Sequence, residues 1–197
     1  MTARIISPQF DNPVHDTQQA FRALLSATSK PGTIVEPPLP RSAPAPLTPA
    51  LAAIALTLLD DTTSVWIDPA LASDDVLRYL RFHTGAVVVA ERSSAQFAMI
   101  ATLENLDDLA AFPGGDASYP DRSATLIVQL PSLTTGNQVQ LAGPGIEHTI
   151  AVAPAGLPQA FWTRWNENAG RYPCGIDIIF TDGRAVMGLP RTTKASF

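Results

Sequence analysis

The chain has 197 residues, 46% of them hydrophobic, and a formal net charge of −5. A chain of this length normally builds one core, so we predict a single domain over residues 1–197. The acidic balance, with two lysines against eleven arginines, argues against general nucleic-acid binding, which needs a basic surface. No apolar stretch is long enough for a bilayer, no secretory signal is visible and the single cysteine allows no internal disulfide. We therefore expect a cytoplasmic protein without a membrane segment.

The first half of the chain shows alternating helix and strand patterns. After an irregular arm over residues 1–15, Asp16 is expected to cap a helix that ends at Pro31-Gly32. Residues 37–49 carry six prolines, which indicates an extended crossing on the surface. Further helices are predicted over residues 48–59, 73–82 and 104–112, and strands over 33–36, 64–68, 86–90 and 96–101. The apolar run 86–90 is typical of a strand buried on both faces.

The second half is richer in strands. Residues 124–130 and 138–142 flank Thr134-Thr135-Gly136-Asn137, which is a hairpin signal, and residues 176–181 and 185–188 flank a stronger one at Asp182-Gly183. A further strand is predicted over residues 148–153, and a helix over 157–168. Early helix–strand alternation followed by late hairpins favours an α/β domain with three layers, α/β/α, and a mixed sheet.

The sequence contains no self-sufficient catalytic motif. It lacks the phosphate-binding GxxxxGK[ST] loop, the GxGxxG turn and the GxSxG nucleophile elbow. Its histidines are far apart and have no metal-ligand spacing, so we expect no metal site. Pyridoxal phosphate needs a lysine, and Lys30 beside a Pro-Gly turn and Lys194 near the chain end are poor candidates for it. We expect no cofactor.

Five segments share the order and spacing of one known family. They read FRALL with SKPG (21–32), LTLLDDTTSVW (56–66), LRFHT (80–84), ATLIVQ with LAGPGI (124–146), and GIDIIF, TDG and LPRTT (175–193). Together they resemble the H subunit of the bacterial carbon–phosphorus lyase core complex, which acts in phosphonate metabolism.

The resemblance implies a non-autonomous subunit that assembles with the G, I and J subunits. With the G, I and L components, the family supports transfer of the ribose triphosphate of ATP onto phosphonates such as methylphosphonate. It also implies a fold similar to the large domain of pyridoxal-phosphate-dependent transferases, without the cofactor. It supplies no catalytic residues. The alternative is an independent small-molecule transferase of that fold.

Two groups of residues are candidates for binding an anion or a partner. Arg78, Arg81 and His83 lie near the end of the helix predicted over residues 73–82, where they either meet one anion or complement the helix dipole. Arg191, Thr192 and Thr193 follow Pro190 after the last predicted strand, where they either bind a phosphoryl group or a neighbouring subunit, or cap and anchor the loop. If Arg191 is exposed and binds an anion or a partner carboxylate, its replacement should impair assembly or activity while changing folding stability by less than ~1 kcal/mol. If its replacement by alanine unfolds the domain, Arg191 is instead a structural counter-ion.

Other residues leave two interpretations open. Asp177 lies in an apolar strand pattern, either as a polar residue that faces outward or as a buried carboxylate paired with an arginine. Phe161, Trp162 and Trp165 form a core cluster, a subunit interface or a ligand-stacking surface. We expect the isolated chain to form a homodimer, with the helix over residues 157–168 or the late hairpin near the contact.

Overall fold

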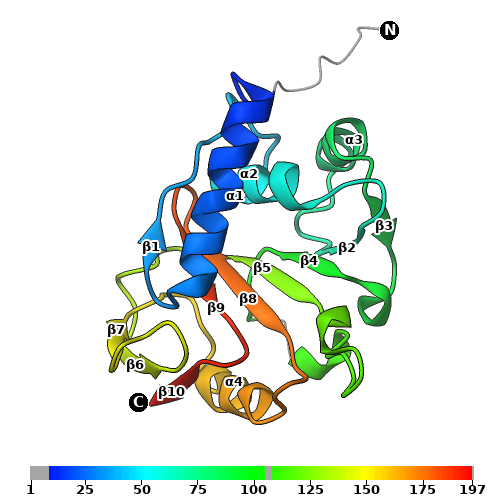
Figure 1. Ribbon diagram of the computed structural model, residues 1–197. Coiled ribbons are helices and arrows are strands. Elements are labelled where there is room, and N and C mark those ends of the chain that lie inside the picture. The colour runs from blue at the N-terminus through cyan, green and yellow to red at the C-terminus, as the bar shows by residue number, and fades with distance from the viewer. Residues whose placement is uncertain (1–8, 105–107, 197) are drawn as a thin grey trace, which may run out of the picture.

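The computed structural model describes residues 9–104 and 108–196, and within them the chain forms an α/β fold with a mixed sheet. The seven-stranded sheet has the order β1-β9-β8-β5-β4-β2-β3, and a three-stranded sheet has the order β10-β6-β7 (Figure 1). The strands are β1 Ile34–Val35, β2 Ser64–Ile67, β3 Val87–Val89, β4 Phe97–Ile100, β5 Thr125–Gln129, β6 Val139–Ala142, β7 Ile150–Val152, β8 Asp177–Thr181, β9 Val186–Leu189 and β10 Lys194–Ser196. From β8 to β3 the neighbours run parallel, whereas β9 is antiparallel to β8 and to β1.

The α-helices of the described residues are α1 Pro13–Ser29, α2 Pro49–Leu58, α3 Asp74–His83 and α4 Phe161–Ala169. The start predicted for the first helix is wrong. Asn12 is the N-cap, its side chain accepts a hydrogen bond from the His15 N–H, and Pro13 occupies the first helical position, where its missing N–H costs nothing. The irregular arm therefore does not extend to residue 15, and residues 1–8 lie outside the described part.

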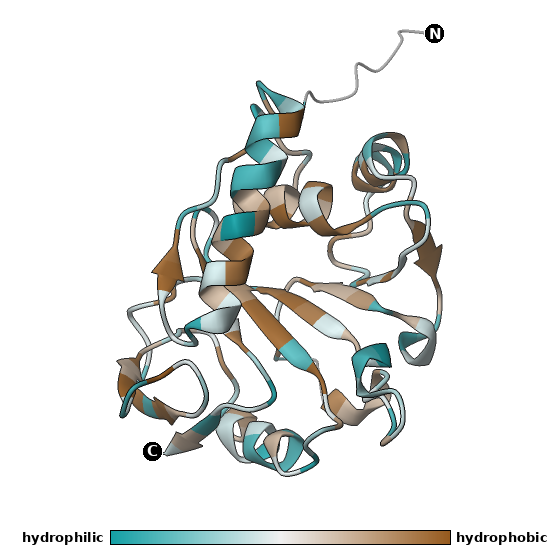
Figure 2. Cartoon of the chain, in the orientation of Figure 1, coloured by the Kyte–Doolittle hydropathy of each residue, from teal (hydrophilic) through white to brown (hydrophobic). Residues whose placement is uncertain are grey.

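The two faces of the large sheet carry separate hydrophobic clusters. Helices α1, α2 and α3 pack on one face around Met99, Ile127 and Ile179, while α4 and the small sheet pack on the other around Leu126 and Phe180. In α2 every residue from 50 to 55 is buried, so that this helix lies inside the molecule. Figure 2 shows the mainly hydrophobic central strands of the sheet, in contrast to α1, whose outer side alternates between hydrophilic and hydrophobic segments.

Strand β3 is the edge of the large sheet, which corrects the prediction of a strand buried on both faces. Val87 and Val88 are 54% and 46% exposed. A run of β-branched residues reports a strand but not its place in the sheet, because the place depends on pairing with distant segments.

Other corrections also concern long-range pairing. Strand β6 pairs with β7 and β10 instead of forming a hairpin with β5, and β10 was not predicted. The helix predicted over residues 104–112 is reduced, in its described part, to the 3₁₀ turn Leu109–Ala111; residues 105–107 lie outside the described residues. The hairpin of β8 and β9 is confirmed, as is the irregular course of the proline-rich segment up to α2. No described helix is long and apolar enough to cross a bilayer.

Candidate functional site

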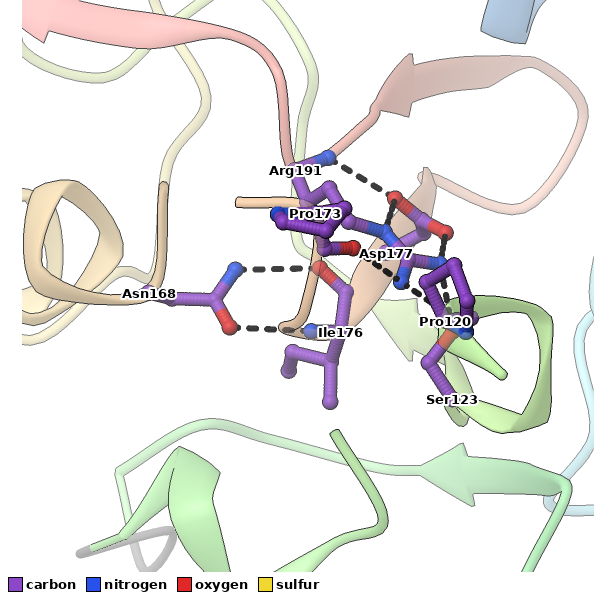
Figure 3. Close-up of polar contacts among 7 residues, drawn as sticks. All are labelled: Pro120, Ser123, Asn168, Pro173, Ile176, Asp177 and Arg191. Atoms are coloured by element: carbon purple, nitrogen blue, oxygen red, sulfur yellow. Dashed lines mark hydrogen bonds and ion pairs between the residues drawn. The ribbon is translucent and has the colours of Figure 1, made fainter. Parts of the chain in front are cut away.

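Arg191 is the centre of the densest polar network in the described chain outside the backbone ladders (Figure 3). Its Nε donates to Asp177 Oδ1 at 3.1 Å, and its Nη2 donates to Asp177 Oδ2 and to the Ser123 hydroxyl. Its Nη1 donates to the carbonyls of Pro120, at 2.9 Å, and Pro173, at 3.4 Å. These contacts use the full donor capacity of a guanidinium.

The expectation that Arg191 is exposed is wrong. Its side chain is only 14% exposed, and that of Asp177 is 27% exposed. Asp177 also accepts the backbone N–H of Arg191 at 2.8 Å, which fixes the turn after β9. The pairing of Asp177 with an arginine is therefore confirmed, although its carboxylate is only partly buried. Binding of an external anion by Arg191 would require these contacts to open, so that role stays a prediction.

The network lies at the edge of the sheet opposite to the usual ligand edge. Open α/β sheets bind ligands at the carboxyl ends of their parallel strands. Strand β9 runs antiparallel to β8, so the residues after its C-terminal end meet Asp177 at the start of β8. The strand direction, which depends on the tertiary pairing, thus places Arg191 at the amino edge.

The neighbouring threonines differ in accessibility. Thr193 is fully buried, its backbone N–H donates to the Pro190 carbonyl, and its own carbonyl accepts the indole N–H of Trp165 at 2.9 Å. Its hydroxyl has no hydrogen-bond partner among the described residues. The turn therefore directs Thr193 into the core beneath α4, and only Thr192 remains half-buried at the surface.

The second candidate group, Arg78, Arg81 and His83, lies on α3, toward the side of the large sheet where β3 is the edge strand (Figure 1). Arg78 Nη1 lies 3.1 Å from Asp75 Oδ1 on the same helix, and His83 packs edge-on against Tyr79 with ring centroids 4.6 Å apart. Arg81 and His83 occupy the last turn, where positive charge complements the helix dipole. Tyr79 is almost fully buried, and this burial raises its pKa to about 12.

Two of the three aromatic residues of α4 belong to the core. Phe161 and Trp165 are 4% and 0% exposed, and their rings are stacked with centroids 6.5 Å apart. Trp162 is half-buried and meets Phe161 edge-on. The amphipathic pattern of the helix predicted the cluster, but only the tertiary structure separates the core pair from Trp162.

The carboxyl edge of the sheet has its own polar residue, which the sequence patterns did not single out. The parallel strand order changes direction between β2 and β4, the kind of place where α/β folds bind ligands. Asp68 follows β2 there, and its carboxylate accepts the N–H of Ala70 and, across the gap between the strands, that of Ala101 at 3.2 Å. The Asp68 carboxylate therefore connects the C-terminal ends of β2 and β4.

No group of three or more potential metal-ligating side chains occurs among the described His, Cys, Asp and Glu residues. Lys30 and Lys194 are both exposed. Neither provides the enclosed position that a Schiff-base lysine needs.

Comparison with known proteins gives a consistent result over nearly the whole chain. The family model described as "Bacterial phosphonate metabolism protein (PhnH)" matches residues 8–196. One relative, the alpha-D-ribose 1-methylphosphonate 5-triphosphate synthase subunit PhnH of Rhizobium meliloti (strain 1021), is 40% identical over 98% of both chains. Another, the putative C-P lyase subunit protein HtxG of Stutzerimonas stutzeri, is 34% identical over 89% of this chain and 84% of its own.

The α/β chain with its mixed sheet and arginine-centred network thus falls in a class of phosphonate metabolism proteins. It belongs to the PhnH family.

Proposed function

We propose that the chain is a non-autonomous subunit of the carbon–phosphorus lyase core complex. In this role it supports transfer of the ribose triphosphate of ATP onto alkylphosphonates such as methylphosphonate. The full-length similarity to a synthase subunit, 40% identical over 98% of both chains, carries the proposal. The proposed partners are the G, I and J subunits, and the proposed location is the cytoplasm.

The polar network is consistent with an accessory role. Arg191 is the most extensively bonded arginine of the described chain, and its donors are directed to the chain's own loops. Such a network positions loops that a partner could contact, and it supplies no nucleophile or general base by itself. The proposed fold similarity to pyridoxal-phosphate-dependent transferases and the proposed homodimer are further parts of this proposal.

Reconstitution tests the function. Purified chain is incubated with ATP and methylphosphonate, alone and with the G, I and L components, and ribose methylphosphonate triphosphate is followed by phosphorus NMR. We expect product only in the complete mixture and its loss when this chain is omitted. Turnover by the chain alone would instead establish an independent transferase, and full activity without the chain would refute the proposed role.

A further inference from the structure

A cleft of about 780 Å³ lies at the start of α4, away from the Arg191 network. Its walls are the loop that precedes β6, the loop that follows β7 and the first turn of α4. The volume falls in the range of about 300–1,000 Å³ that small-molecule sites commonly have. The half-buried indole of Trp162 lines it, and the edge-on ring of Phe161 supports that indole at a centroid distance of 4.9 Å.

The two loops are held together closely. The Gly136 N–H donates to the Ala153 carbonyl at 2.7 Å, and the Ala155 N–H donates to the Ser132 carbonyl at 2.9 Å. A Cβ atom at Gly136 would lie 2.2 Å from the Pro154 carbonyl oxygen, so this approach requires glycine. Cross-loop hydrogen bonds and a glycine contact make the wall preorganised, which lowers the ordering cost of binding.

The described lining is mostly apolar, includes several polar side chains and carries no charge. Besides Trp162, the described lining residues include three with a carboxamide, Asn137, Gln138 and Gln159, and two with a hydroxyl, Thr135 and Thr163; none of them is Asp, Glu, Lys, Arg or His. An indole offers a flat stacking surface, and a carboxamide presents a donor beside an acceptor. That pair is complementary to the N6 and N7 edge of adenine. The described lining residues therefore offer no cationic side chain to a phosphate group.

We propose that this cleft binds the purine base of a nucleotide. The base stacks on Trp162, the carboxamides contact its edge, and the phosphates extend out of the cleft. The inference rests on the proposed function, in which ATP supplies the ribose triphosphate, and it assigns the base end of that substrate to this subunit. A concave, preorganised wall with three amides suits a small planar ligand better than a partner's flat surface.

The test is binding of adenosine to the isolated chain, measured by calorimetry and by tryptophan fluorescence. Adenosine should bind saturably and quench Trp162, since Trp66 and Trp165 are buried. AMP should bind within a few-fold of adenosine, and ribose should not compete. Trp162→Leu should weaken binding at least about fivefold, the lower bound for loss of one base–aromatic stack. Asn137→Ala and Gln159→Ala, at exposed positions, should each weaken it several-fold.

Phe21→Leu is the control, because Phe21 is 45% exposed on α1 and its replacement should leave adenosine binding unchanged. If Trp162→Leu does not fold, as judged by circular dichroism, the two amide variants decide the matter. Absence of saturable adenosine binding, equal competition by ribose, or ATP binding more than tenfold tighter than adenosine would each overturn the assignment. The assignment would also be overturned if the wild-type chain is a dimer that does not bind adenosine and Trp162→Leu converts this dimer to a monomer. The assay needs no partner subunit, so its result is separate from that of the reconstitution.

Discussion

Arg191 joins segments that are far apart in the sequence. Its side chain bridges Asp177, Ser123 and the carbonyl of Pro120 within a site only 14% exposed on the arginine side. Removing one partner of such a pair leaves a largely desolvated carboxylate and several carbonyls without donors. The small stability effect expected for an exposed arginine therefore no longer applies.

We predict that Arg191→Ala lowers the free energy of unfolding by about 2–4 kcal/mol, measured by urea denaturation. Arg191→Lys should recover only part, because one ammonium group cannot reproduce the planar fork. Arg184→Ala, at an exposed position in the β8–β9 turn, is the matched control and should change stability by less than about 0.5 kcal/mol. If Arg191→Ala keeps wild-type stability and loses assembly with partner subunits, the arginine instead serves a binding role.

Tyr79 should make stability depend on pH in the alkaline range. Its phenol has an ordinary pKa of 10.0, and burial raises the pKa to about 12 in the folded chain. Below pH 10 the phenol is neutral in both states. Above it the unfolded state ionises first, so stability is lost as pH rises from 10 to about 12.

At pH 11 this loss amounts to about 1.4 kcal/mol, from the same two pKa values. We predict that Tyr79→Phe removes that part of the pH dependence, seen as the difference between the two proteins in urea denaturation at pH 8 and pH 11. At pH 8 the substitution should cost less than about 1 kcal/mol, because the hydroxyl has no hydrogen-bond partner among the described residues. Parallel curves for the two proteins would show that Tyr79 does not titrate in this way.

The connection between α4 and β8 depends on one buried amide. Asn168, 5% exposed near the end of α4, donates to the Ile176 carbonyl at 3.0 Å and accepts the Ile176 N–H at 2.9 Å. Figure 3 shows this pair beside the Arg191 network. The side-chain amide of Asn168 thus makes the two hydrogen bonds to the Ile176 backbone that a neighbouring strand would otherwise make, just before β8 begins.

We predict that Asn168→Ala destabilises the chain by about 2–4 kcal/mol, since two buried backbone groups lose their partners. Asn166→Ala is the matched comparison. Asn166 makes the same pair of bonds, to the carbonyl and N–H of Ala195, but is only half-buried, so water can replace them. Thermal unfolding should rank the two variants clearly. Equal losses would mean that burial of the amide does not set its contribution.

Self-association is a property of the whole molecule. The structure changes the surface on which we expect the dimer contact. Phe161 and Trp165 of α4 are core residues, and the β8–β9 hairpin lies inside the sheet between β5 and β1. One group of exposed apolar residues lies at β3 and the end of α3, where Phe82, Val87 and Val88 are 67%, 54% and 46% exposed; another, Val14, Phe21 and Leu25, lies on α1. The Val87 N–H donates to Thr63, so the N–H of Val88 points away from β2.

We predict that the isolated chain is a homodimer through this edge, because two identical edge strands can pair about a two-fold axis. Val88→Lys should shift the mass measured by light scattering toward the monomer. Ile34→Lys, at an exposed position on β1 at the opposite edge, should not. A wild-type monomer at high concentration would remove the dimer from the proposal, and a shift by Ile34→Lys alone would place the contact at β1.

The sequence by itself determined the local elements and the family. Periodicity, caps and the Asp182-Gly183 turn act over a few residues, so they indicated the helices, most strands and the last hairpin. Only the tertiary structure decided that β3 is an edge, that β6 joins a separate sheet and that Arg191 faces Asp177 rather than solvent. These features depend on pairing between segments that are far apart in the sequence. Neither the entropy of closing the loops between those segments nor their packing against each other produces a recognisable local sequence pattern.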